Sequence, residues 1–277
     1  MQFTRRLFFA VTALCLAAAL PVFAAGPTVP TAGQVSVDHG WPLSGATFTY
    51  AKGPFPQVPV VVVTAQKNGI ALMAAADMVT TKEFVVRLVE PSTGEFVGDG
   101  GGVDMRSVAI VPDAKSGIMA GSAPRADGDT VTFTLPFTSV PVVVCSAYDP
   151  VSKTPLRACA VNVTRSSFTI SLRNRDGSPG SGTVDYIAVT PSPGGTKFKE
   201  VTIASGTLTV ASGSSVSFGT GLPNSPLGLL CSASANGAAC TAGFDAQNDG
   251  GFTAVAAGDN GADPGKVSFS WVGVCTP

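Results

Sequence analysis

The chain has little charge and few of the side chains that carry out catalysis. Only 13% of its 277 residues are charged, the formal net charge is −1, and His39 is the single histidine. A Ser-His-Asp site would have to use that histidine, and the sequence contains no phosphate-binding loop, HExxH or CxxC motif. We therefore expect no enzymatic activity, and the lack of a basic cluster argues against nucleic acid as a partner.

Helical periodicity is also missing. No stretch after residue 24 repeats apolar residues every 3.6 positions between helix caps, and none is long and apolar enough to span a membrane. Yet 45% of the chain is hydrophobic, so the composition is not that of a disordered polymer. Residues 70–79 alone allow a helical interpretation, but they align with a predicted strand of a later repeat. These features favour an all-β protein with an uncharged surface.

The first 24 residues have the layout of a secretory signal peptide. Arg5 and Arg6 precede an apolar run over 7–20, and small residues follow at the cleavage position. The fragment TRRLFF (4–9) also resembles a twin-arginine signal, so both export routes are open. Because Cys15 follows Leu14 and not a small residue, a lipoprotein anchor is not expected. The sequence predicts a bacterial protein that is secreted, periplasmic or on the cell surface.

The rest of the chain repeats one unit three times. Phe84, Phe168 and Phe252 stand in matching contexts at intervals of 84 residues. The phrase PFPQVPVVVVTAQK (54–67) returns as PFTSVPVVVCSAYDP (136–150) and, more weakly, as LPNSPLGLLCSAS (222–234). Landmarks that recur in one order indicate a repeat architecture. We define unit 1 as residues 31–112, unit 2 as 113–191 and unit 3 as 192–277.

Each unit is predicted to be a six-stranded antiparallel β-sandwich. In unit 2 the strands rich in Val, Ile, Thr, Phe and Tyr are 116–121, 129–134, 140–147, 156–163, 167–173 and 182–189. The run Val142 to Cys145 is apolar at every position, whereas a strand with one face in water would alternate. We expect one face of this strand to lie in the sandwich core. The hypothesis for the other face is contact with a neighbouring unit, which would make the chain a pseudo-trimer.

Five cysteines follow the predicted signal peptide. Cys145 and Cys231 both begin the tripeptide CSA, and Cys159 and Cys240 both stand in an Ala-Cys dipeptide. Equivalent placement in two repeats predicts the disulfides Cys145–Cys159 and Cys231–Cys240, and export favours their oxidation. Cys275 is left over, either free or available to join chains.

The repeated pattern resembles the H-type lectin domain. An early glycine-initiated strand is followed by two phenylalanines, a proline, a valine-rich strand, an arginine-bearing strand, a phenylalanine strand and a closing strand. Unit 2 shows the pattern in Gly117, Phe133, Phe137, Pro141, Val142–Val144, Arg157, Phe168 and VDYIAV (184–189). Unit 3 supplies Phe218, Pro226, Phe252 and Trp271, and unit 1 is looser with Phe55, Pro59 and Phe84.

The resemblance implies sandwiches that assemble as trimers and bind galactose-type sugars in clefts between protomers. Its sugar-binding arginine corresponds to Arg157, and its acidic residue to Asp127 or Asp129. Its Trp-His pair falls near Arg175 and Asp176, and no unit has Trp-His there. The family site is thus mostly absent although the fold pattern is kept.

Other side chains complete the list of candidates. Aromatic rings stack on sugar faces, and the candidates for this role are Trp41, Tyr148 and Tyr186. Tyr148 follows the valine-rich strand in a loop and is expected to be exposed, whereas Tyr186 has a core-type position in the closing strand. The acidic loops 244–251 and 258–265 could hold calcium through Asp259, Asn260 and Asp263, but they lack the spacing of a calcium loop, and turn formation is the simpler interpretation. No other cofactor is indicated.

The sequence therefore predicts an exported protein that binds carbohydrate or mediates adhesion through glycans on cell surfaces. Arg157 would donate hydrogen bonds to sugar hydroxyls, Asp127 or Asp129 would accept them, and Tyr148 would form an apolar wall. The alternative is a structural or surface-assembly subunit, with possible self-association, that keeps the fold without sugar binding.

Overall fold

The protein is all-β in the computed structural model, which describes residues 34–99, 101–111, 117–219 and 222–277. The predicted signal peptide, residues 1–24, lies outside the described residues. Within the described ranges there is no α-helix, only the 3₁₀ turn η2 (Asp259–Gly261). Nor does that part of the chain contain a helix with the length and hydrophobicity to span a membrane.

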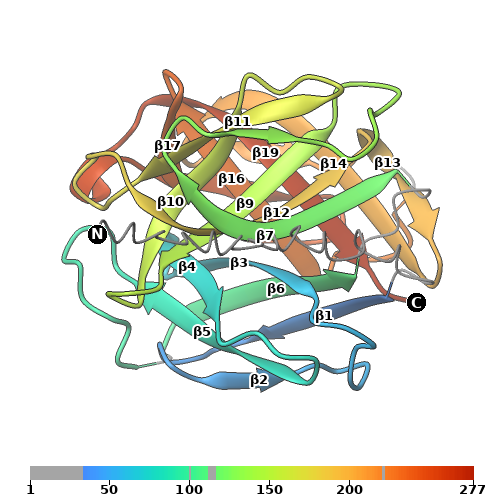
Figure 1. Cartoon of the computed structure of the whole chain (residues 1–277), viewed down its shortest axis with the longest axis horizontal. Coiled ribbons are helices and arrows are strands. Elements are labelled where there is room, and N and C mark those ends of the chain that lie inside the picture. The colour runs from blue at the N-terminus through green and yellow to red at the C-terminus, as the bar shows by residue number, and fades with distance from the viewer. Residues whose placement is uncertain (1–33, 100, 112–116, 220–221) are drawn as a thin grey trace, which may run out of the picture.

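Each unit forms one antiparallel sheet with the same strand order (Figure 1). The order in unit 1 is β1 (Gln34–Gly40), β6 (Val103–Val111), β3 (Val60–Lys67), β4 (Ile70–Asp77), β5 (Glu83–Val89) and β2 (Thr47–Thr49). The order in unit 2 is β7 (Ile118–Ala126), β12 (Ser181–Val189), β9 (Val142–Asp149), β10 (Thr154–Val161), β11 (Ser167–Arg173) and β8 (Thr130–Thr132). The order in unit 3 is β13 (Ser192–Phe198), β14 (Val201–Ala211), β19 (Lys266–Cys275), β16 (Gly228–Ala235), β17 (Ala238–Asp245), β18 (Gly251–Ala257) and β15 (Ser215–Ser217).

The fourth strand of each unit curls the sheet into a sandwich. In β10, residues 154–156 pair with β9, and residues 157–161 pair with β11. The first part of the strand therefore belongs to one layer and the second part to the other. All six strands predicted for unit 2 are confirmed, and so is the strand interpretation of residues 70–79, where β4 ends at Asp77.

Unit 3 departs from the predicted six strands because it has a seventh. The unit begins with β13, which folds back on β14 as a hairpin whose turn is Lys199–Glu200. Lys199 has a φ of 53°, the left-handed geometry that a tight two-residue turn requires. The hairpin lies against Val35 of unit 1 and against Ile118 and Val189 of unit 2.

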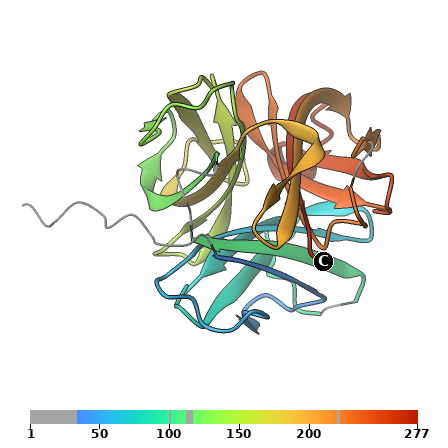
Figure 2. The same ribbon diagram turned by 90° about the vertical axis from the view of Figure 1, so that its right-hand side faces the viewer.

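The three units pack around a common axis, as the three lobes of Figure 2 show. One apolar cluster contains buried side chains from all three units. Its members are Val35, Val60, Val62, Val108, Ile110, Ile118, Val142, Val144, Ile187, Val189, Phe198, Val201, Ile203, Leu230, Val272 and Val274. A cluster drawn from every unit is the core of the trimer-like assembly, so the pseudo-trimer hypothesis is confirmed.

The valine-rich strand β9 shows how one strand serves two cores. Val142 and Val144 lie in the shared central cluster, whereas Val143 and Cys145 lie in the sandwich core of unit 2 with Phe168. Side chains alternate between the faces of a strand, so both faces of β9 are covered by protein. The unbroken apolar run in the sequence follows directly from this arrangement.

Hydrogen bonds also close the ring of units. Each third strand donates one backbone N–H to a side-chain hydroxyl on the third strand of the next unit. The bonds run from Val63 N to Ser146 Oγ (3.4 Å), from Cys145 N to Ser232 Oγ (2.9 Å) and from Cys231 N to Thr64 Oγ1 (2.9 Å). The same bond is thus made three times, once at each interface.

Candidate functional site

Arg157, the predicted sugar-binding arginine, is buried on β10 with 2% of its surface exposed. Its Nε and Nη2 donate to the carbonyl oxygen of Asn174 at 3.1 and 2.7 Å. Nη2 also donates to Oδ1 of Asp259 in unit 3 at 2.7 Å. Two of its three nitrogens are therefore engaged, and one of them, Nη2, joins unit 2 to unit 3.

The acidic candidates are engaged as well. Asp127 accepts a hydrogen bond from Leu172 N at 2.8 Å and pairs with Arg173 at 3.0 Å. Asp129 accepts one from Ala126 N at 2.9 Å, and Asp176 accepts two from Ser178. The bonds from Ser178 lower the pKa of Asp176. These carboxylates organise turns of unit 2.

The two remaining candidates face unit 1. Arg175 Nη1 donates to the carbonyl oxygens of Pro91 and Ser92 at 3.4 and 3.2 Å. Tyr148 lies beside Lys153, whose amino group is 5.8 Å from the centre of the ring. Burial raises the pKa of the Tyr148 hydroxyl, and the nearby carboxylate of Asp77 in unit 1 raises it further. The structure thus brings these residues to the boundaries between units, where they bond to protein.

Two other aromatic side chains pack against glycines. Trp271 is 2% exposed, and a Cβ at Gly206 would lie 2.9 Å from its Nε1. A Cβ at Gly121 would lie 2.6 Å from Cε1 of Tyr186. Each ring therefore occupies space that only a glycine on the neighbouring strand leaves open. Trp41 is 77% exposed and is the one candidate ring that stands in solvent.

Neither predicted disulfide is present, because all five cysteines of the described residues are free and buried. Cys145 lies in the unit 2 core with Leu156 and Ala158 of β10. Alternation along β10 then directs Cys159 to the opposite face. In unit 3, Cys240 lies opposite Ala233, two residues beyond Cys231. The Ala-Cys dipeptides occupy different registers in the two units, so the sequence match was misleading.

The acidic loops of unit 3 form turns. Asp259 bonds to Arg157 as described, and Asp263 accepts a hydrogen bond from Gly265 N at 2.9 Å. No group of three or more His, Cys, Asp or Glu side chains is placed to hold a metal ion in the described ranges.

A cleft of about 510 Å³ opens between unit 2 and unit 3, and sequence reasoning did not find it. We call it the 2/3 cleft. From unit 2 it is lined by Val140, Pro141, Val142, Val143, Ala160, Val161, Asn162, Val163 and Pro191. From unit 3 it is lined by Thr207, Ser234, Gly237, Ser268 and Ser270. No charged side chain is among them.

The register of the sheets identifies the same positions in the other two interfaces. Ser270 lies opposite Ser232, Asp185 opposite Ser146, and Arg106 opposite Thr64. Because these hydroxyl residues are the three acceptors of the ring of hydrogen bonds, Ser270, Asp185 and Arg106 are structurally equivalent. The fourth strands can be aligned in the same way. Arg157 is the first residue of β10 that pairs with β11, and Thr241 is the first residue of β17 that pairs with β18. Ala160, three residues after Arg157, is therefore equivalent to Phe244, three residues after Thr241.

In the interface between units 3 and 1, large side chains fill the equivalent space. Arg106 forms a two-point ion pair with Asp104 at 2.9 and 3.1 Å. Its Nη1 donates to Leu227 O at 3.1 Å, and its guanidinium lies over the ring of Phe244 at 5.6 Å. The 2/3 cleft has Ser270 and Ala160 at these two positions, so it stays open.

In the interface between units 1 and 2, polar groups close the space. Asp185 is 4% exposed, and burial raises its pKa to about 7 although a hydrogen bond from Ser122 acts in the opposite direction. Asp77 of unit 1 binds Arg87 at 2.8 Å and Lys153 of unit 2 at 3.5 Å. The hydrogen bond to Arg87 contributes to the lowered pKa of Asp77. Of these three equivalent spaces, the 2/3 cleft is therefore the one that is both large and lined without charged side chains.

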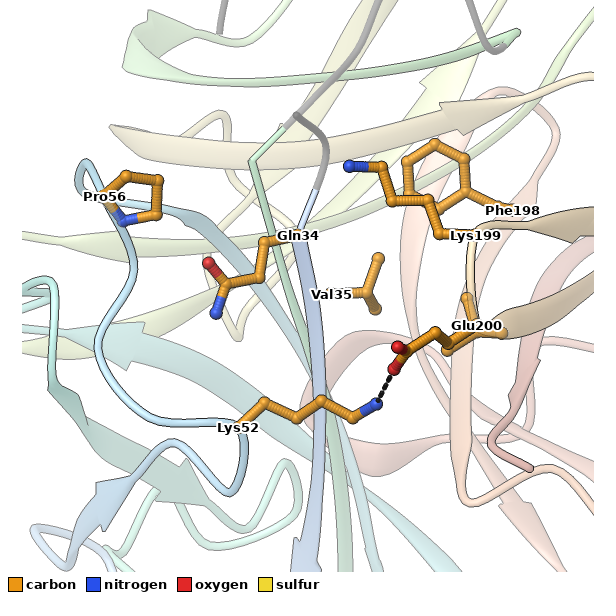
Figure 3. A pocket seen from close by; sticks show the side chains of 8 residues that line it. Gln34, Val35, Lys52, Pro56, Phe198, Lys199 and Glu200 are labelled. Atoms are coloured by element: carbon orange, nitrogen blue, oxygen red, sulfur yellow. Dashed lines mark hydrogen bonds and ion pairs between the residues drawn. The ribbon is translucent and has the colours of Figure 1, made fainter. Parts of the chain in front are cut away.

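A second hollow, of about 360 Å³, lies between unit 1 and the β13–β14 hairpin (Figure 3). Gln34, Lys52 and Pro56 face Lys199 and Glu200 across it, and Lys52 Nζ pairs with Glu200 at 2.9 Å. This hollow begins where β1 begins, beside residues that the structure does not describe. For that reason we do not assign a ligand to it.

The 2/3 cleft presents two kinds of surface. Thr207 Oγ1 and Ser270 Oγ lie 3.0 Å apart and form a hydroxyl pair on one wall. Asn162 adds an exposed amide, and Val140, 51% exposed, belongs to an aliphatic wall opposite. Hydroxyls and amides both donate and accept hydrogen bonds. The cleft can therefore bind an uncharged ligand that has polar edges and an apolar face.

No protein-family model and no curated protein matches the sequence.

Proposed function

We propose that the protein binds neutral carbohydrate outside the cytoplasm, in the 2/3 cleft, without catalysing a reaction on it. The observation that carries the proposal is the uncharged lining of the 2/3 cleft, which is rich in hydroxyls on the unit 3 side and has Ser270 where the other two interfaces have Arg106 and Asp185. Sugar rings combine hydroxyl groups around their edges with C–H groups on their faces, and this matches the two walls of the cleft. The volume also lies within the usual range of ligand pockets, roughly 300–1,000 Å³.

The binding chemistry would be simple. Thr207, Ser268 and Ser270 would exchange hydrogen bonds with sugar hydroxyls, and Asn162 would contribute an amide. Val140 and the neighbouring aliphatic side chains would cover the C–H face. Because no aromatic ring lines the cleft, we expect weak binding, with a dissociation constant on the order of 0.1–1 mM.

The test uses saturation-transfer NMR with a panel of neutral mono- and oligosaccharides. The informative variant is Ser270→Arg, which places in the 2/3 cleft the residue that fills the equivalent space beside unit 3. It should weaken binding at least tenfold. Ser215→Arg is the matched control, because Ser215 is exposed on β15 and does not line the cleft.

Two results would count against the proposal in different ways. If the unmodified protein binds no sugar of the panel, carbohydrate binding is wrong. If it binds sugars and Ser270→Arg binds them equally well, the function stands and the 2/3 cleft is the wrong place.

A structural or surface-assembly subunit is the second candidate. It is favoured by the bonding of Arg157, Arg175 and Asp127, whose polar groups join parts of the protein to one another. Light scattering that shows ordered oligomers, in a protein that binds no sugar, would support this candidate.

A further inference from the structure

A small polar cavity of about 30 Å³ lies where the three units meet on their common axis. Equivalent residues of all three units line it, which places it on the axis and not within one unit. Units 2 and 3 contribute the polar side chains Ser146, Arg157, Ser232 and Thr241, and unit 1 contributes apolar ones such as Val63 and Leu72.

Two hydroxyls of the cavity have already used an acceptor position. Ser146 Oγ accepts the bond from Val63 N, and Ser232 Oγ accepts the bond from Cys145 N. Neither hydroxyl donates its own hydrogen to an acceptor among the described residues. Both therefore have an O–H available to donate.

Two further groups have unmet hydrogen-bonding capacity. Thr241 is 3% exposed, and its Oγ1 has no hydrogen-bond partner within the part of the chain that the structure describes. Arg157 uses Nε and Nη2 as described above, whereas its Nη1 makes no hydrogen bond to any described residue. A buried polar group without a partner is costly, and such groups usually bond to an ordered occupant.

The cavity contains donors and no fixed negative charge. Burial raises the thiol pKa of Cys145, Cys231 and Cys240, so these side chains are neutral. No carboxylate of the described residues lines the cavity. Asp259, 65% exposed, bonds to Arg157 Nη2, and Asp185, which pairs with Ser146 in the sheet, has its pKa raised by burial to about 7. The hydroxyls can bond to a water molecule as well as to an anion, but the charged guanidinium of Arg157 makes a stronger hydrogen bond to an anion than to a neutral water.

We propose that the axial cavity is a binding site for one small monovalent anion, of which chloride is the representative. Arg157, Ser146, Ser232 and Thr241 donate to it, and the apolar side chains of unit 1 close the cavity. The volume admits a single water-sized particle and excludes sulfate or phosphate. An occupant held by units 2 and 3 together would strengthen their interface.

The experiment combines bromide with a conservative variant. Crystals of the full protein soaked in bromide should show one anomalous peak on the axis, within hydrogen-bonding distance of Thr241 Oγ1. In solution, replacing gluconate by 200 mM chloride at constant ionic strength should raise Tm by about 2–4 °C. Thr241→Val should lose both responses, and Thr209→Val, at an exposed position of β14, should keep them.

The proposal is overturned if the axial density carries no anomalous signal, since the occupant would then be water only. It is also overturned if chloride does not change the Tm of the unmodified protein, a result that does not depend on whether Thr241→Val folds.

Discussion

Thr64 Oγ1 in unit 1 accepts a 2.9 Å hydrogen bond from the backbone N–H of Cys231 in unit 3. The two residues are 167 positions apart in the sequence, yet both are buried where the three units meet. This bond joins unit 3 to unit 1. Together with the bonds accepted by Ser146 and Ser232, it completes the ring of three interface hydrogen bonds.

The first prediction concerns this bond. Thr64→Val keeps the shape of the side chain but leaves Cys231 N–H buried without an acceptor, which costs about 1–3 kcal/mol. We expect the free energy of unfolding, measured by urea denaturation, to fall by that amount. Thr64→Ser keeps the acceptor and should lose less. Equal stability of Thr64→Val and the unmodified protein would show that the bond does not contribute.

The second prediction concerns the filled space between units 3 and 1. Arg106→Ala removes the ion pair with Asp104, the bond to Leu227 O and the contact with Phe244. Because these groups are partly buried, the loss should be about 1–2 kcal/mol in chemical denaturation. Arg165→Ala, at an exposed position, is the control. An equal loss in both variants would mean that Arg106 acts only as a surface charge.

The third prediction concerns pH and Asp185. Burial raises its pKa from 3.8 to about 7, so between these values the folded protein holds a proton that the unfolded chain releases. The stability contributed by this group is therefore complete below about pH 4 and is lost as the pH rises toward 7. The full difference is on the order of 4 kcal/mol, because one pKa unit corresponds to about 1.4 kcal/mol.

Asp185→Asn removes the titration, so its stability relative to the unmodified protein should rise between pH 5 and pH 8. Denaturation at these two pH values measures the difference. Asp249→Asn, at an exposed turn, should show no such change. A constant difference between Asp185→Asn and the unmodified protein across this range would contradict the assignment.

The fourth prediction concerns the cysteines. All five of the described thiols are buried, and burial raises the pKa of Cys159 to about 12, which suppresses the reactive thiolate. A thiol reagent should therefore modify none of them in the folded protein within an hour and all five after unfolding in guanidinium. A disulfide-linked peptide that joins Cys145 to Cys159 in a non-reducing digest would show that the bridge forms after all.

Much of the fold could be predicted because core residues recur at a fixed interval in the sequence. Phe84, Phe168 and Phe252 recur at equal intervals since each lies in the same place of its sandwich core. The apolar run at Val142 also pointed to a strand covered on both faces. Both signals report which side chains are buried, because buried positions are occupied by apolar residues in a regular pattern.

The site was harder to predict because its parts come from separate strands. Arg157 matched a sugar-binding position, but its bond to Asp259 joins residues in different units. The 2/3 cleft depends on the absence of large side chains at Ser270 and Ala160, and a missing side chain gives no motif. An alignment of the three closing strands would have given a signal for the cleft, because Ser270 is small and uncharged where the other two units have the charged residues Arg106 and Asp185.

The joining of three units in one chain has a consequence for how the protein can change. In a trimer of identical chains, one mutation alters three interfaces at once, so any residue that opens a binding space also weakens every contact. Here each interface is encoded separately. One can evolve as a receptor for ligand while Arg106 and Asp77 hold the other two together, and selection on recognition is thereby released from selection on assembly.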